Sequence, residues 1–141
     1  MFYLDTSVIV AALVNEEASE RASAFLWEAV NTTRVVVSDW TLTEFSSAIA
    51  LKIRTGQLNS DYQAEIQNVF DGLVMETFEL IPVERRHFLL AAKLAAQRNV
   101  NLRASDALHL AISEETRTEL VTLDRRMAEA GAALEIAARL I

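Results

Sequence analysis

Short apolar runs alternate along the chain with longer segments of helical periodicity. The short runs have the length and the aliphatic or β-branched content of buried strands, and they lie at residues 2–4, 34–38, 78–81 and 120–123. Strands that are apolar almost throughout, rather than at every second position, are typical of a parallel sheet covered on both faces. The pattern therefore predicts an α/β fold, a three-layer α/β/α sandwich around a mostly parallel sheet.

The segments between these strands carry helix start and stop signals. The predicted helices span about residues 6–12, 17–30, 41–54, 60–71, 84–97, 105–113 and 125–130, and residues 134–136 are a candidate edge strand. The third helix is assigned from Thr41-Leu-Thr-Glu44, which has the S/T-x-x-E form of a capping box. The fourth helix is expected to end ahead of Gly72, because glycine often follows a helix terminus.

Length and composition indicate one domain spanning residues 1–141. The chain holds only three Gly, one Pro and no Cys, so we expect no linker, no disulfide and no thiolate metal site. No apolar run reaches the roughly 18 residues of a membrane span, and the N-terminal segment lacks a basic region. These features predict a cytoplasmic protein that does not bind membranes.

Net charge bears on the choice of partner. Twenty acidic and thirteen basic residues give a formal charge of −7, which argues against broad non-specific binding to nucleic acid. A nuclease remains compatible with this charge if the acids cluster around a metal and arginines supply local phosphate contacts. The arginines considered for that role are Arg85, Arg86, Arg103, Arg125 and Arg126.

Four acidic residues stand at strand ends or at the starts of the facing helices: Asp5, Glu44, Asp106 and Asp124. The carboxyl ends of parallel strands meet at one crevice, so these side chains are expected to converge there. Carboxylates that share a crevice repel one another unless a cation neutralises them. A donor set made only of oxygens favours Mg²⁺ or Mn²⁺, so the sequence predicts a metal site.

Each acid also has a purely structural interpretation. Asp5 and Asp124 could be N-caps, and Glu44 could close the capping box that begins at Thr41. The metal interpretation is favoured because one cap explains one acid, whereas all four are directed to the same crevice. His109 lies one turn after Asp106 and could face that crevice, but packing is the commoner role for a histidine on an apolar helix. His87 is expected at the surface.

Several segments resemble the motifs of PIN-domain ribonucleases, in particular the VapC-type toxins of type II toxin–antitoxin systems. These segments are Leu4-Asp-Thr-Ser-Val8, Thr43-Glu44, Leu102-Arg-Ala-Ser-Asp-Ala-Leu-His-Leu-Ala111 and Val121-Thr-Leu-Asp-Arg-Arg126. The resemblance covers essentially the whole chain, and the third segment is the most specific. Trp40 and Leu123 depart from the family pattern without removing an acid.

The resemblance implies a PIN-like fold and a metal-dependent endoribonuclease toxin. It makes Asp5, Glu44, Asp106 and Asp124 the catalytic, metal-binding acids for Mg²⁺ or Mn²⁺, with Thr6 or Ser7 hydrogen-bonded around Asp5. It further implies an RNA substrate, a cognate VapB-type antitoxin and a homodimer.

Two other functional classes compete with the nuclease. A catalytically silent PIN-like module that binds RNA or protein is one, and the intact set of four acids counts against it. A phosphatase or receiver domain is the other. The first strand ends in Leu4-Asp-Thr-Ser7 rather than a paired Asp-x-Asp, and arginines follow Asp124 where a receiver would have a lysine.

Overall fold

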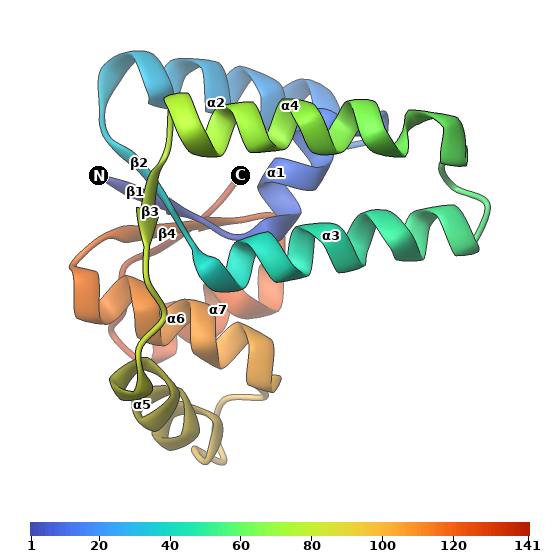
Figure 1. Ribbon diagram of the computed structural model, residues 1–141. Coiled ribbons are helices and arrows are strands. Elements are labelled where there is room, and N and C mark those ends of the chain that lie inside the picture. Colours follow the sequence, from blue (N-terminus) through green and yellow to red (C-terminus); the bar gives the residue numbers. More distant parts are fainter.

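The computed structural model describes all residues from 1 to 141 and contains one five-stranded sheet (Figure 1). Its strands are β1 (Phe2–Leu4), β2 (Val35–Ser38), β3 (Glu79–Ile81), β4 (Glu119–Thr122) and β5 (Ala138–Leu140). The order across the sheet is β3-β2-β1-β4-β5, and every neighbouring pair is parallel. The predicted α/β fold with a mostly parallel sheet is confirmed.

Helices cover both faces of this sheet, as a buried parallel sheet requires. They are α1 (Thr6–Leu13), α2 (Ser19–Thr32), α3 (Asp39–Arg54), α4 (Gln63–Glu76), α5 (Arg85–Ala95), α6 (Ala104–Thr116) and α7 (Arg125–Ala133), with a 3₁₀ turn at Ser60–Tyr62. Helices α1 to α4 pack on one face and α5 to α7 on the other, which gives two separate apolar cores. None of the helices is long and apolar enough to cross a membrane.

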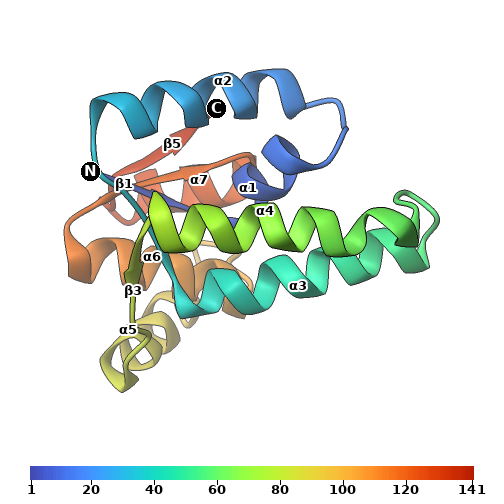
Figure 2. The same ribbon diagram turned by 45° about the horizontal axis from the view of Figure 1, so that its top comes forward.

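Helices α3 and α4 form an antiparallel arm that extends beyond the sheet (Figure 2). The stacked rings of Phe45 and Phe70, whose centroids are 3.9 Å apart, join the two helices where they leave the core. The N-terminal part of the arm, helix α3, also lines the cavity at the carboxyl ends of the strands.

The strand order places a topological switch point between β1 and β4. The chain leaves β1 toward β2 and β3, and it later returns to β4 on the opposite side of β1. Connections that diverge from two adjacent parallel strands leave a crevice at their carboxyl ends, where open α/β sheets bind their ligands. Asp5 directly follows β1, and Asp124 lies two residues beyond the end of β4.

The start of α3 differs from the sequence prediction. The helix begins at Asp39 rather than near Thr41, and its capping box is formed by Ser38 and Thr41. Ser38 is the last residue of β2, so the strand passes directly into the helix. The capping box assigned to Thr41 and Glu44 is therefore wrong, and Glu44 lies in the second turn of α3. Trp40 is part of the same helix.

Two other predicted boundaries are clearly wrong, whereas the remaining helix ends lie within three residues of the prediction. Helix α4 continues through Gly72 to Glu76 and ends at the C-cap residue Thr77, and Gly72 does not have the positive φ of a terminating glycine. The edge strand is β5 at Ala138–Leu140 instead of residues 134–136. Ile136 is buried in the core, and its backbone amide bonds to Gly131 in α7 rather than to a strand.

Candidate functional site

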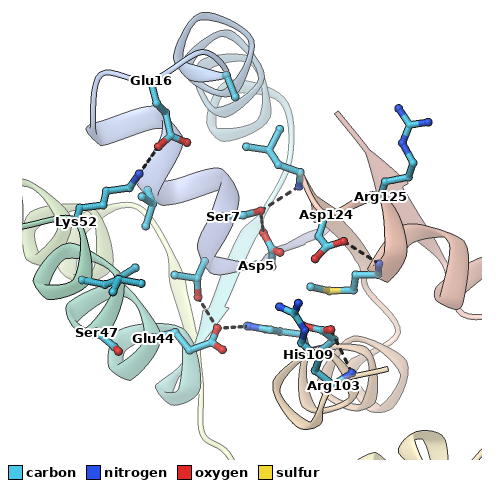
Figure 3. Close-up of a pocket in the computed structure, with 18 of the residues that line it drawn as sticks. Asp5, Ser7, Glu16, Glu44, Ser47, Lys52, Arg103, His109, Asp124 and Arg125 are labelled. Carbon is cyan, nitrogen blue, oxygen red and sulfur yellow. Dashed lines mark hydrogen bonds and ion pairs between the residues drawn. The ribbon is translucent and has the colours of Figure 1, made fainter. Parts of the chain in front are cut away.

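A cavity of about 870 Å³ opens at the carboxyl ends of the strands (Figure 3). All four predicted acids line it: Asp5, Glu44, Asp106 and Asp124. They come from four elements that are far apart in sequence, namely the ends of β1 and β4 and the helices α3 and α6. The expected convergence at the switch point is present, and Glu16 adds a fifth acid to the lining.

Asp5 is the most buried of these carboxylates, with 3% of its surface exposed. Its Oδ1 accepts hydrogen bonds from the Ser7 hydroxyl at 2.6 Å and the Val8 amide at 3.3 Å, and its Oδ2 accepts from the Thr122 hydroxyl at 2.7 Å. Burial raises the pKa of Asp5 above its usual value, although these donors and His109 oppose the effect. The carboxylate is thus desolvated, and a cation in the cavity would stabilise its charge.

The donors around Asp5 also connect the two strands of the switch point. Ser7 accepts a bond from the Leu123 amide at 3.0 Å, and Thr122 Oγ1 accepts one from the Asp124 amide at 2.8 Å. The hydroxyl predicted to lie near Asp5 is therefore that of Ser7. Thr6 bonds elsewhere, to Glu44.

Glu44 has no role in helix capping. Its Oε2 accepts from Thr6 Oγ1 at 2.7 Å and lies 2.6 Å from Nε2 of His109. Burial raises the pKa of Glu44, but the hydrogen bond and charge of His109 and the bond from Thr6 outweigh it, so the net pKa is lowered. The indole N–H of Trp40 makes a smaller contribution to lowering the pKa of Glu44. This N–H is buried, and no acceptor lies within hydrogen-bonding distance of it. Glu44 is therefore held as an anion.

Asp106 and Asp124 have capping contacts as well as a place in the cavity lining. Asp106 Oδ2 accepts from the backbone amide of Arg103 at 3.3 Å, at the start of α6. Asp124 is the N-cap of α7, where its Oδ1 accepts from the amides of Arg126 and Met127. The N-cap interpretation is therefore correct for Asp124, and it is also correct for Asp5, whose side chain caps α1 by accepting from the Val8 amide. Capping does not exclude cation binding, because a carboxylate has about four acceptor positions.

His109 lies at the wall of the cavity, although only 2% of its surface is exposed. Its Nε2 contacts Glu44 (Figure 3). Its Nδ1 lies 2.7 Å from the Tyr3 hydroxyl. The spacing from Asp106 signalled a possible place at the crevice, whereas nothing in the sequence indicated the contact with Tyr3. His87 is buried, not exposed as predicted, because its Nδ1 accepts from the Glu84 amide in the capping box of α5.

Basic side chains surround part of the cavity. Arg103 and Arg125 line it, as expected for candidate phosphate contacts, whereas Arg85, Arg86 and Arg126 are not in its lining. Lys52 and Arg21 were not identified from the sequence, and they line the end of the cavity between α2 and α3. Lys52 Nζ is 2.6 Å from Glu16 Oε2, so the fifth acid is paired with a cation.

The carboxylates fit a hard divalent cation by their chemistry. They offer only oxygen donors, and Asp5 is a desolvated carboxylate without a paired cation. No three acidic or histidine side chains lie close enough together to hold one ion directly. Mg²⁺ commonly keeps several waters and binds through one or two carboxylates together with substrate phosphates, so it does not require three protein ligands at one point.

Comparison with known proteins identifies relatives of this chain. The model of the PIN domain family matches residues 2–133. The structure of FitAB bound to a DNA fragment contains a chain with 20% identity and a TM-score of 0.76, and the alignment covers 99% of this chain and 94% of that one. FitAcB from Neisseria gonorrhoeae has 21% identity and a TM-score of 0.69, with coverage of 98% and 96%.

A third structure is VapC20 from Mycobacterium tuberculosis, described as a sarcin-ricin loop cleaving toxin. It is 15% identical, has a TM-score of 0.72 and is aligned over 93% of this chain and 95% of that one. No curated protein matches the sequence. At these identities the three structures establish the shared fold.

Proposed function

Because the chain belongs to the PIN domain family, whose members are typically nucleases, we propose that it is a metal-dependent endoribonuclease of the VapC type. The observation that carries the proposal is the cavity in which Asp5, Glu44, Asp106 and Asp124 converge from four separate elements. Helix capping alone does not require that carboxylates from four separate elements face the same cavity. The metal would be Mg²⁺ or Mn²⁺.

Hydrolysis of a phosphodiester requires an activated water and neutralisation of charge on the phosphate and on the leaving oxygen. A carboxylate-bound divalent ion, when present, supplies both by lowering the pKa of water and by acting as a Lewis acid. Asp5 and Asp106 would hold the ion directly from opposite walls of the cavity. Glu44 and Asp124 would bind it through water or would hold a second ion.

The surrounding side chains have supporting roles in this proposal. Ser7 and Thr122 fix the orientation of Asp5, since each donates to a different carboxylate oxygen. Arg103 and Arg125 lie at the cavity where they can contact phosphate oxygens. These local cations offset the net charge of −7 for an RNA strand that enters the cavity.

The proposal includes the partners of such a toxin, namely a VapB-type antitoxin, a second copy of the chain and an RNA substrate in the cytoplasm. Support comes from the similar structures, which include FitAB and a toxin–antitoxin complex from Klebsiella pneumoniae. An antitoxin arginine that enters the carboxylate cavity would form charge-assisted hydrogen bonds and block it.

The test compares the wild type with Asp5→Asn and Asp106→Asn, all purified without a partner, for cleavage of total cellular RNA with Mg²⁺, with Mn²⁺ and with EDTA. We expect cleavage only by the wild type with a divalent ion, and a loss of about a hundredfold or more in each variant. Asp61→Asn is the matched control, because Asp61 is an exposed carboxylate outside the cavity lining. It should cleave like the wild type.

The alternative is a catalytically silent PIN-like module that binds RNA or protein. It would be supported if the wild type cleaved none of several RNA pools and bound no Mn²⁺ by calorimetry. Cleavage that persisted in folded Asp5→Asn and Asp106→Asn would instead contradict the assignment of the site.

A further inference from the structure

A buried chain of polar side chains connects the cavity to the interior of the sheet. Tyr3 in β1 places its hydroxyl 2.8 Å from Ser38 Oγ and 2.7 Å from His109 Nδ1. The other ring nitrogen of His109 lies 2.6 Å from Glu44 Oε2, at the cavity wall. Tyr3 and Ser38 are fully buried and His109 is 2% exposed, so water cannot take over these bonds.

The chemistry of Glu44 fixes the direction of the bond at the cavity end. The Glu44 oxygen that faces His109 already accepts from Thr6, and carboxylate oxygens accept hydrogen bonds, so the 2.6 Å contact assigns the hydrogen to Nε2 of His109. A lone pair on Nε2 would face a negative oxygen at 2.6 Å. The Tyr3 hydroxyl occupies the second ring nitrogen and thereby sets the orientation of the imidazole.

The two oxygens of Glu44 are not equivalent in this arrangement. Oε2 receives both the His109 bond and the bond from Thr6, whereas no protein group donates to Oε1. A carboxylate held through one oxygen by two donors from different helices has little freedom to rotate. Its second oxygen is therefore kept available at the cavity, where Glu44 remains partly exposed.

We propose that His109 is a positioning residue of the nuclease, which holds Glu44 Oε2 through its Nε2–H, is itself fixed by the Tyr3 hydroxyl, and so directs Glu44 Oε1 toward the divalent cation. The inference rests on the proposed function, because it assigns His109 a role at that metal site. His109 does not touch the RNA or the reacting atoms. Its effect on catalysis is exerted only through the carboxylate.

Two substitutions at His109 separate a positioning role from a packing role. Leucine fills a similar volume without a donor, whereas glutamine places an N–H group close to the position of Nε2. We expect His109→Leu to weaken Mn²⁺ binding by about 10- to 100-fold in calorimetry, and His109→Gln to recover most of that affinity. With RNA at saturating concentration, kcat should fall in His109→Leu while KM for RNA changes little.

Tyr3→Phe tests the same chain without changing the histidine, and it keeps the proposal testable if His109→Leu fails to fold. It removes only the hydroxyl, and Mn²⁺ affinity should again fall. The control is His87→Gln, which replaces the other histidine at a buried site outside the cavity and should leave Mn²⁺ affinity unchanged. In the wild type, ¹⁵N NMR of the imidazole should show a proton on Nε2 of His109.

The outcomes distinguish the two levels of the proposal. A wild type that neither binds Mn²⁺ nor cleaves RNA overturns the proposed function and the positioning role together. A wild type that does both, with unchanged Mn²⁺ affinity in folded His109→Leu and Tyr3→Phe, overturns only the role of His109. An unprotonated Nε2 in the NMR spectrum also overturns it, whatever the activity.

Discussion

At the scale of single residues, Asp5 combines burial with a complete set of local donors. Three groups from α1 and β4 bond to its two oxygens, so its orientation is set before any ligand arrives. Because these hydrogen bonds already fix the carboxylate, its side chain needs to move little when a cation binds. The same burial makes the charged form costly in the free protein, and the pKa of Asp5 is accordingly raised.

His87 provides a pH-dependent test of the fold outside the cavity. Burial, with a contribution from the Arg86 guanidinium, lowers the pKa of His87 below its usual value. The native state therefore binds fewer protons than the unfolded state, so the stabilisation is present above the unfolded pKa of about 6.5 and is lost as the pH falls. His87→Gln keeps an acceptor for the Glu84 amide but does not titrate.

We expect the melting temperature of the wild type, minus that of His87→Gln, to decrease as the pH is lowered from about 7.5 to about 5. Thermal unfolding followed by circular dichroism at a series of pH values measures this difference, and titrations common to both proteins cancel in it. A difference that stays constant over this range would show that His87 does not titrate differently in the folded state.

The surroundings of the two histidines could be predicted only in part from the sequence. The spacing of His109 from Asp106 placed it on the correct side of α6, but its contact with Tyr3 joins residues 106 positions apart and depends on the packing of β1 against α6. His87 follows two arginines, a context typical of the surface. The capping box of α5 nevertheless turns it inward.

At the scale of elements, Gly131 governs the contact between α7 and β5. A Cβ on Gly131 would lie 2.6 Å from Cβ of Ala138, 3.2 Å from the Ile136 carbonyl oxygen and 3.3 Å from a methyl of Leu110. Two of these neighbours belong to the backbone or are fixed to it, so they cannot move aside alone. The helix can approach the strand this closely only because the residue is glycine.

Gly131→Ala should therefore destabilise the protein by about 1–3 kcal/mol, even though alanine favours a helix by about 1 kcal/mol. Gly72→Ala is the matched control in α4, because nothing lies within 4 Å of the added Cβ. It should stabilise by about 0.5–1 kcal/mol. Urea unfolding of both variants measures the two effects, and stabilisation of similar size in both would show that α7 and β5 are not in close contact.

Local sequence signals placed some element boundaries correctly and misplaced others. The helix that ends at Arg54 was placed correctly at its C-terminus, but its start was assigned to Thr41 because Thr41-Leu-Thr-Glu44 also has the form of a capping box. Ser38, which caps the helix, was hidden inside a predicted strand. The last strand was misplaced because the apolar side chains of Leu134 and Ile136 pack in the core next to α7 and do not belong to a strand.

At the scale of the whole molecule, the parallel sheet determines that distant acids meet. Local patterns predicted the α/β class, and the position of each acid at a strand end or facing helix predicted a shared crevice. The strand order, the switch point between β1 and β4, and the part of the wall formed by α3 are set by tertiary packing and have no local signal. Five acidic and four basic side chains line the cavity, so most of the net negative charge of the chain lies outside it.

This arrangement predicts that a divalent cation stabilises the whole fold. Binding to the native state alone adds about 2.7 kcal/mol when the free ion is at 100 times its dissociation constant. Mn²⁺ should therefore raise the melting temperature of the wild type and of Asp61→Asn, but not that of Asp5→Asn, which lacks the buried charge. Monovalent salt at the same ionic strength controls for general screening of the net charge. An equal increase in wild type and Asp5→Asn would place the cation elsewhere on the acidic surface, because removal of the most buried carboxylate must weaken binding inside the cavity.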